Sequence, residues 1–406
     1  MKKDIFWNSL GTGAWSFLSL FLLIIVTRVN GIIDSGLFSF AFALALIMFT
    51  IGCYGGRTYQ VSDHKDSLTT DNYISLRIYT SLAVILLTGL FVILNGNDWH
   101  KSILIFLLVG QRVFDAIADV FYGIVQKKHH LYISGKSLFY KSTLSLIIFL
   151  VIDLFTKSLL LSTLSLPIVS LLFILLYDIP QSRKLESFNI KPNFTNMLGI
   201  LKTTFLPFII IVMGLVFVNL ARYFIDIYHP DLQGYFGIII MPLSLILLLF
   251  SFILTPVIMH LSDSYNNQKY HAVRQSVTKI TGIVVSVTLP LCILTYFFGV
   301  PLLQLLFNVD FSPYIIDLVL VILIGLMVSL ASLFTNIAII ARKLPLTAII
   351  NLLSNAILVL LCIMLVGQYQ IRGAIIAYVI ASVAQAGVMG SYYMYLTSRY
   401  STSRNS

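Results

Sequence analysis

Twelve long apolar stretches cover nearly the whole chain, and this pattern constrains the fold more than any motif. About 20 consecutive apolar residues cross the roughly 30 Å hydrocarbon layer of a membrane as one helix. With 58% hydrophobic and 10% charged residues, the composition lies outside the range of soluble globular domains, so we expect an all-α polytopic membrane protein. The predicted spans are Leu10–Val29, Gly36–Val61, Ile78–Leu94, Ser102–Gln126, Leu138–Leu154, Ser158–Tyr177, Thr204–Leu220, Gly234–Met259, Ile280–Phe298, Leu318–Ile340, Ala348–Val366 and Gly373–Tyr395.

Most of the basic residues lie in every second gap between these spans. Twenty of the 26 Lys and Arg residues fall on one side of the predicted bundle and five on the other, while Arg112 lies within a span. Cytoplasmic loops carry such an excess, so both termini are predicted to be cytoplasmic. The net charge of +10 therefore indicates contact with anionic membrane lipids and gives no reason to expect nucleic acid as a partner.

Landmarks in the first half of the chain recur about 200 residues later. A Gly-x-Phe triplet opens the second and the eighth span, at Gly36 and Gly234, and a Ser-Asp pair follows each span, ending at Asp63 and Asp263. The repeat predicts two six-helix lobes of equal orientation, an arrangement that suits alternating access; chance similarity between apolar sequences is the alternative. The predicted divisions are an N-terminal lobe (1–177), a cytoplasmic linker (178–203), a C-terminal lobe (204–395) and a cytoplasmic tail (396–406).

The fourth span carries the most informative polar residues. Its polar side chains recur at helical spacing and share one stripe of the helix. A charge facing lipid at mid-bilayer costs at least about 2.5 kcal/mol, so this stripe should face water or protein. It either lines a cavity or contains an internal Arg112–Asp115 pair with Asp119 reaching the cytoplasmic surface. The stripe consists of Gln111, Arg112, Asp115, Asp119, Tyr122 and Gln126.

Three further arginines end or interrupt predicted helices. Arg28 and Arg222 end the first and seventh spans, and Arg57 follows a Gly-rich segment within an unusually long second span. Each is either a cavity residue or a side chain that reaches the membrane surface while its stem stays in the apolar layer. Arginine binds phosphate oxygens in a bidentate fork, so these side chains, with Arg112, are the candidate binding residues for a ligand that bears phosphate.

The sequence contains no motif of an enzyme or a metal site. It lacks the H-E-x-x-H, P-loop and G-x-S-x-G patterns, and its three cysteines lie in spans without a pair motif. The predicted outer loops are too short for a catalytic domain. We therefore expect a transporter without a resident metal or cofactor, in which H⁺ or Na⁺ is the candidate coupling ion.

Several segments resemble the polysaccharide flippases of the Wzx type, which belong to the multidrug/oligosaccharidyl-lipid/polysaccharide exporter (MOP) superfamily. The resemblance covers most of residues 1–260 and weakens afterwards to hydropathy alone. The segments that carry it are Trp7–Gly11, Thr27–Gly31, Ser35–Ala41, Gly56–Asp63, Asp115–Lys127, Gly135–Ser137, Tyr223–Asp226, Gly234–Ile238 and Met241-Pro242.

The resemblance implies a MATE-like fold of two lobes in the bacterial plasma membrane, around a cationic cavity. It implies a substrate in which undecaprenyl-(pyro)phosphate carries an oligosaccharide repeat unit, moved to the outer leaflet for capsule or other surface polysaccharide. Arg28 and Arg57 match cavity positions of related flippases, and Arg222 holds the equivalent place in the second half. A polysaccharide polymerase and the chain-length machinery are candidate partners.

Asp115 and Asp119 are the candidate groups for coupling transport to protons, because a carboxylate held away from water can exchange a proton. Two other functions stay open. A drug or small-molecule antiporter of the same superfamily would share the fold but should have an acidic or aromatic cavity. A membrane polysaccharide polymerase should have a large outer loop with clustered charges, which this sequence lacks.

Overall fold

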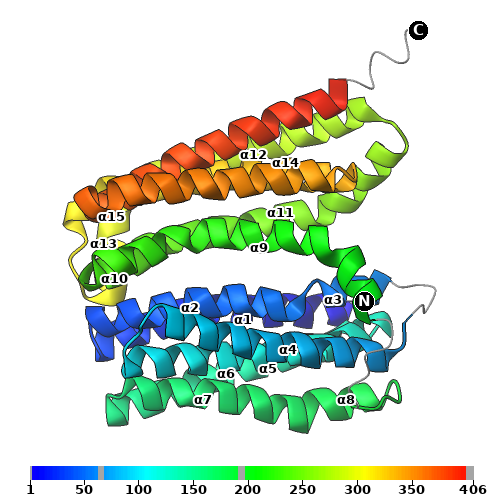
Figure 1. The fold of residues 1–406 in the computed structure, drawn as a ribbon, viewed down its shortest axis with the longest axis horizontal. Helices are drawn as coiled ribbons and strands as arrows, with labels where there is room; N and C mark the ends of the chain where they lie inside the picture. The colour runs from blue at the N-terminus through cyan, green and yellow to red at the C-terminus, as the bar shows by residue number, and fades with distance from the viewer. Residues whose placement is uncertain (1, 63–67, 191–196, 399–406) are drawn as a thin grey trace. The chain divides into compact units, whose positions relative to one another are not determined.

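The computed structural model describes residues 2–62, 68–190 and 197–398, and all regular elements in these ranges are helices (Figure 1). Ten helical segments of the described chain are long and apolar enough to cross a membrane. The prediction of an all-α polytopic membrane protein is therefore confirmed. The total of twelve crossings and the side on which the termini lie stay predictions.

Two helices explain why the structure has ten such segments, whereas the sequence predicts twelve spans. Helix α5 (Trp99–Lys127) is 29 residues long but carries Arg112, Asp115 and Asp119 in its middle. Helix α15 (Leu344–Ser398) contains a non-helical residue, Gln370, and joins two helices there. Figure 1 shows its orange and red parts running back along each other. The last two predicted spans correspond to these two parts.

Contacts divide the chain into two units, residues 1–212 and 213–406, which we call unit 1 and unit 2. The division falls within α9 (Met197–Tyr228). Part of the predicted linker, 191–196, and the end of the predicted tail, 399–406, lie outside the described residues. Before α9, unit 1 contains α1 (Lys2–Val29), α2 (Ile32–Cys53), α3 (Gly56–Ser62), α4 (Thr70–Leu94), α5, α6 (Leu131–Thr156), α7 (Leu159–Phe173), the π-helix η1 (Ile174–Asp178) and α8 (Ile179–Arg183).

In unit 2, α14 packs against α10, α11, α12 and α15. The large buried side chains of unit 2 include Phe236, Phe307 and Tyr378. After α9, unit 2 contains η2 (Pro230–Leu232), α10 (Gln233–Ile239), α11 (Met241–Asn266), α12 (Tyr270–Leu294), the π-helix η3 (Thr295–Gly299), α13 (Val300–Phe307), η4 (Ser312–Tyr314), α14 (Ile315–Ile340) and α15.

The second predicted span, 36–61, is two helices. Tyr54 and Gly55 both have positive φ, 44° and 67°, and they separate α2 from α3. Glycine adopts this conformation without strain, so the Gly-rich segment that follows Cys53 permits a complete break. The break redirects the chain and places Arg57 in the first turn of α3 instead of on a continuous α2.

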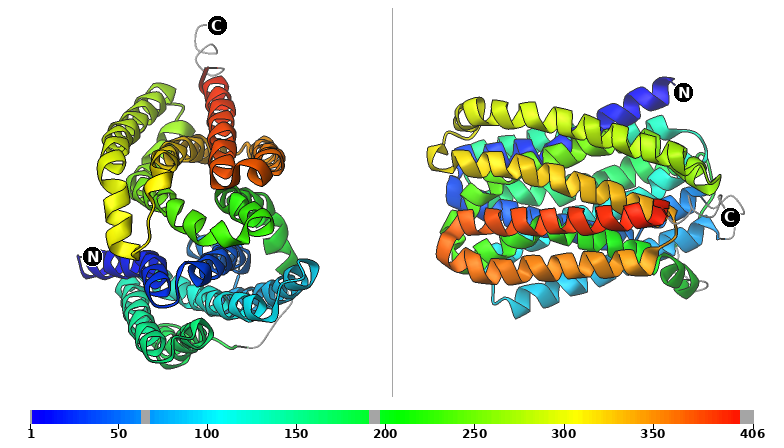
Figure 2. Two further views of the ribbon diagram at one scale, coloured as in Figure 1. Left: turned by 90° about the vertical axis from the view of Figure 1, so that its left-hand side faces the viewer. Right: turned by 90° about the horizontal axis from the view of Figure 1, so that it is seen from above.

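Helix α5 lies in the middle of unit 1. It packs against α2, α3, α4, α6 and α7, and the end-on view in Figure 2 shows the helices of this unit running roughly along one direction. Because its neighbours surround it, the polar stripe of α5 faces protein rather than lipid. The sequence prediction that the stripe avoids lipid is therefore confirmed for Gln111, Arg112 and Asp115, which are all buried.

Helices α1 and α6 approach so closely that two glycines are required at the crossing. A Cβ on Gly11 would lie 2.1 Å from the carbonyl oxygen of Gly135, and a Cβ on Gly135 would lie 2.4 Å from the backbone of Trp7. Small residues permit this close backbone approach between membrane helices. Gly13, two residues along α1, has no atom within 4 Å of its Cβ position.

These two positions give a matched test of the packing. We expect Gly11→Ala to lower the free energy of unfolding by about 1–3 kcal/mol, because the methyl group forces α1 from α6. Gly13→Ala should leave it unchanged or slightly higher, since Ala favours helix over Gly by up to about 1 kcal/mol. The measurement is the thermal unfolding midpoint of the purified protein in detergent. Equal midpoints for the two variants would contradict the close crossing.

Candidate functional site

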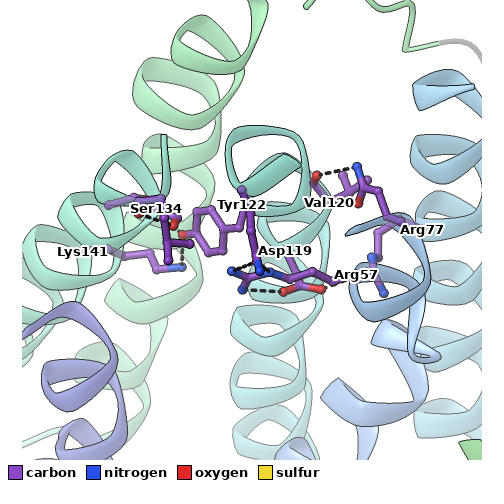
Figure 3. A network of polar contacts seen from close by, with 11 residues as sticks. Arg57, Arg77, Asp119, Val120, Tyr122, Ser134 and Lys141 are labelled. Atoms are coloured by element: carbon purple, nitrogen blue, oxygen red, sulfur yellow. Dashed lines mark hydrogen bonds and ion pairs between the residues drawn. The ribbon is translucent and has the colours of Figure 1, made fainter. Parts of the chain in front are cut away.

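Two ion-pair clusters lie on the polar stripe of α5, and the first is centred on Asp119. Arg77 Nη2 on α4 lies 3.0 Å from Asp119 Oδ2, and Arg57 Nη1 on α3 lies 3.4 Å from Oδ1 (Figure 3). Arg57 also donates to Gln126 Oε1 through Nε and Nη2, at 3.0 and 2.8 Å. One carboxylate of α5 therefore holds cations from two other helices.

Arg77 also caps the C-terminal end of α2. Its Nη1 donates to the carbonyl oxygen of Gly52 at 2.8 Å, and the Thr80 hydroxyl donates to the same oxygen at 2.7 Å. The last carbonyls of a helix have no partner within the helix, and a cation is favoured at this end. The break after α2 is thus stabilised by the arginine that contacts Asp119.

The second cluster is centred on Asp115, one helical turn away. Lys141 Nζ on α6 lies 2.6 Å from Asp115 Oδ1, and Arg112 Nη1 lies 3.0 Å from Oδ2. Trp15 Nε1 on α1 donates to Oδ2 at 3.4 Å. The Arg112 guanidinium lies 4.9 Å from the ring centroid of Trp15 and 4.7 Å from that of Phe42. The two cations and the carboxylate are all at most 5% exposed.

Tyr122 connects the two clusters. Arg57 lies 5.9 Å from the Tyr122 ring centroid, and Lys141 Nζ donates to the Tyr122 hydroxyl at 3.4 Å (Figure 3). That hydroxyl shares a hydrogen bond of 3.0 Å with Ser137, and Ser137 hydrogen-bonds Asp178 in η1. A continuous series of polar groups therefore extends from Asp115 to the π-helix.

The Asp115 cluster lies well inside the apolar layer by helix length. Asp115 is twelve residues from the end of α5 at Lys127, and Lys141 is ten residues from the start of α6 at Leu131. At 1.5 Å per residue these positions are about 18 and 15 Å from the helix ends. Of the charged side chains that are buried among the described residues, six lie in unit 1, and Asp317 is the one in unit 2.

No protein-family model matches the chain. Its sequence is similar to that of the capsular polysaccharide biosynthesis protein CapF of Staphylococcus aureus, with 25% identity over 381 residues, 92% of this chain and 93% of CapF. Its fold is similar to that of an inward-facing multidrug resistance MATE family transporter of the MOP superfamily, with a TM-score of 0.72, 12% identity and coverage of 96% of this chain and 95% of the transporter. It is also similar to the lipid II flippase MurJ in an inward closed conformation, with a TM-score of 0.71, 15% identity and coverage of 94% and 86%.

The predicted resemblance to the MOP superfamily is confirmed as a resemblance of fold. The chain has the fold of MOP-superfamily transporters and flippases, and it is a multi-pass bacterial membrane protein with a relative in capsular polysaccharide biosynthesis. The MATE-like fold expected from the sequence is therefore confirmed.

Of the predicted site residues, unit 1 brings together Arg57, Arg112, Asp115 and Asp119. Arg28 is not among them: it is exposed at the end of α1, while Arg57 lies beyond the far end of the 22-residue α2. That helix is about 33 Å long. The three arginines and two aspartates of unit 1 therefore do not form one site, and their roles in binding or coupling stay predictions.

Arg222 belongs to unit 2, where it lies near Tyr378. Unit 2 holds a polar contact between the two parts of α15, in which Gln385 Nε2 donates to Asn351 Oδ1 at 3.2 Å. Asn351 and Gln385 therefore form a hydrogen bond between two helices. The buried Asp317 faces the half-exposed Arg372, with 3.5 Å between Oδ2 and Nη2.

The sequence analysis missed Arg77, Lys141 and Asp178. It placed the two cations among the basic residues of the inner surface and Asp178 in the linker, yet all three side chains are about 3% exposed. Lys141 had one recognisable signal, because it lies within the predicted span Leu138–Leu154, where Asp153 is the one other charged residue. Arg77 gave none, since it lies near the start of α4, where a surface cation is ordinary.

The balance of charge at Asp115 predicts a graded response to substitution. Asp115→Asn leaves Arg112 and Lys141 without their shared carboxylate, so it should destabilise the protein by about 3–5 kcal/mol. The double variant Asp115→Asn, Lys141→Met should lose less stability, because only Arg112 is then left without a carboxylate. Asp231→Asn, an exposed site, is the control. Thermal unfolding in detergent measures all three, and a greater loss in the double variant than in Asp115→Asn alone would contradict the pairing.

Proposed function

We propose that this protein is a flippase that moves an undecaprenyl-(pyro)phosphate-linked oligosaccharide repeat unit from the inner to the outer leaflet by alternating access. It would serve the export of capsule or another surface polysaccharide and would deliver its product to the polymerase and chain-length machinery. The similarity to CapF supports the polysaccharide, and the fold supports transport rather than catalysis.

The observation that carries the proposal is that cations outnumber carboxylates in the two ion-pair clusters of unit 1. Four cationic side chains, Arg57, Arg77, Arg112 and Lys141, share two carboxylates in direct ion pairs. Such an excess attracts an anionic ligand, because partners of opposite charge attract strongly in an environment of low dielectric constant. A lipid-linked sugar phosphate is an anion that resides in the membrane.

Arg57 is the cation of this network that a substrate can reach. Its side chain is 28% exposed, whereas those of Arg77, Arg112 and Lys141 are 3–4% exposed. Its present partners are the neutral amide of Gln126 and, at 3.4 Å, Asp119. A phosphate can take the place of both, because Asp119 keeps its shorter contact with Arg77. We assign Arg57 the phosphate and leave Arg112 as a support of Asp115.

Substitution of Arg57 tests the proposal. In a strain that lacks the gene, Arg57→Gln should restore transport at least about tenfold less well than wild type, because a charge-assisted hydrogen bond contributes about 1.5–3 kcal/mol. Arg57→Lys should retain part of the activity, since it keeps the charge but loses the fork. Lys157→Gln, at an exposed helix end, is the control. The measurement is the lipid-linked oligosaccharide trapped on the cytoplasmic leaflet together with surface polysaccharide.

Each outcome of that experiment has a distinct meaning. Full complementation by Arg57→Gln, with folded protein at normal amounts, would contradict the assignment of phosphate binding to Arg57. If deletion of the gene leaves both pools unchanged, the flippase proposal itself is wrong, and the small-molecule antiporter that shares the fold becomes the function to pursue. If repeat units reach the outer leaflet and stay unpolymerised, the protein acts at polymerisation.

Asp119 is the better of the two candidate groups for proton coupling. It touches Arg57 and is 15% exposed, while Asp115 is held by two cations and is 5% exposed. A phosphate bound to Arg57 is repelled by a charged Asp119, and a proton on Asp119 removes this repulsion. Binding of substrate and binding of a proton should therefore favour each other.

This linkage predicts how transport depends on pH. Wild-type affinity for the lipid-linked substrate should rise as the cytoplasmic pH falls, whereas Asp119→Asn should show little change, because the amide is neutral at every pH. Flipping of a fluorescent lipid-linked sugar in proteoliposomes at several internal pH values measures the effect. An Asp119→Asn profile as steep as that of wild type would exclude Asp119 as the coupling group.

A further inference from the structure

Unit 2 contains a cleft of about 690 Å³ between α12, α14 and α15. Both α12 and α15 pack on α14, and their ribbons are seen end-on in Figure 2. The cleft is separate from the ion-pair network, which lies in unit 1. Its lining residues are Arg274, Val277, Thr278, Thr281, Phe334, Gly390, Tyr393, Met394, Tyr395 and Thr397.

The cleft lies near one end of α12. Arg274 is four residues from the start of α12, and Thr281 is seven residues further along the helix. At 1.5 Å per residue this wall starts about 6 Å from the helix end and reaches about 17 Å. Half of a bilayer's hydrocarbon layer is about 15 Å thick. Arg274 precedes the predicted span Ile280–Phe298, whereas Phe334 and Gly390 lie within predicted spans, so the cleft extends from the level of the headgroups into the hydrocarbon layer.

Aromatic side chains form its apolar wall. The rings of Phe334 and Tyr393 stack with centroids 5.3 Å apart and planes 19° from parallel. Gly390 keeps the stack in place, because a Cβ there would lie 3.2 Å from the Phe334 ring. A hydrocarbon chain can lie along this wall without exposing a polar group.

Arg274 supplies the charge at the shallow end of the cleft. It is exposed and interacts electrostatically with Tyr393. Arg274 is the one charged residue among the described residues that line the cleft. A cation at headgroup level above an apolar wall is complementary to a lipid phosphate.

We propose that the cleft binds an anionic phospholipid of the surrounding leaflet. Its phosphate lies on Arg274, and one acyl chain follows the Phe334–Tyr393 wall towards Thr281. A phospholipid fits because its acyl chains are as long as one leaflet is deep, whereas a polyprenyl chain is far longer. The bound lipid fills the space between α12 and α15 and makes the stability of unit 2 depend on anionic lipid.

The full chain, purified in detergent, provides the test. The probes are phosphatidylglycerol and the zwitterionic phosphatidylcholine, and the readouts are lipid retained in native mass spectra and the shift of the thermal unfolding midpoint. Wild type should retain phosphatidylglycerol in preference to phosphatidylcholine. Arg274→Gln should bind phosphatidylglycerol about fivefold more weakly, the effect of one cation at an anionic lipid surface. Thr278→Trp, which fills the cleft from an exposed position, should lose the retained lipid.

Lys279→Gln is the matched control, because it removes the same charge from an exposed residue of α12 that does not line the cleft. It should bind like wild type. An equal loss in Lys279→Gln and Arg274→Gln would overturn the site in favour of unspecific attraction to the basic surface. Displacement of phosphatidylglycerol by undecaprenyl phosphate at equal concentration would overturn the phospholipid as occupant.

Discussion

The transfer of charge away from water is the constraint on which unit 1 depends. An ion buried in a protein costs several kcal/mol unless a partner of opposite charge and hydrogen bonds compensate for the lost water. Asp115 meets this requirement with Lys141, Arg112 and the indole of Trp15, which come from α6, α5 and α1. A single carboxylate therefore fixes three helices relative to one another. The close α1–α6 crossing at Gly11 and Gly135 keeps those helices near enough for it to do so.

Asp119 obeys the same constraint with a different consequence. Its tight partner, Arg77, is also bound to the end of α2, so this pair belongs to the framework. Its looser partner, Arg57, belongs to the short α3 that follows the break at Tyr54 and Gly55. One oxygen of the carboxylate thus serves the fold, and the other contacts the cation that a ligand can reach. This division allows Arg57 to exchange partners while Asp119 stays neutralised.

The sequence was sufficient for the fold class and for one half of the site. Apolar spans have a direct physical cause in the thickness of the bilayer, and the period of a helix places Arg112, Asp115 and Asp119 on one stripe without any tertiary information. The partners of that stripe could not be predicted, because Lys141 and Arg77 lie on other helices and their burial depends on packing. The position of Arg28 relative to Arg57 could not be predicted either. Its likeness to a family position did not reveal that α2 places Arg57 at the other end of the unit.

The repeat in the sequence and the difference between the two units fit together once burial is considered. Of the repeated landmarks, Gly36 and Gly234 are buried near the starts of α2 and α10, and Asp263 lies near the end of α11, while Asp63 lies outside the described residues. The buried charges are not repeated: unit 1 holds six and unit 2 holds Asp317 among the described residues. A duplicated framework can therefore keep its helix ends in both halves while the interior of one half specialises for charge. Unit 2 holds one buried charge among its described residues, Asp317, and the partner that we propose for Arg274, the cation that lines its cleft, is a membrane lipid rather than a buried carboxylate.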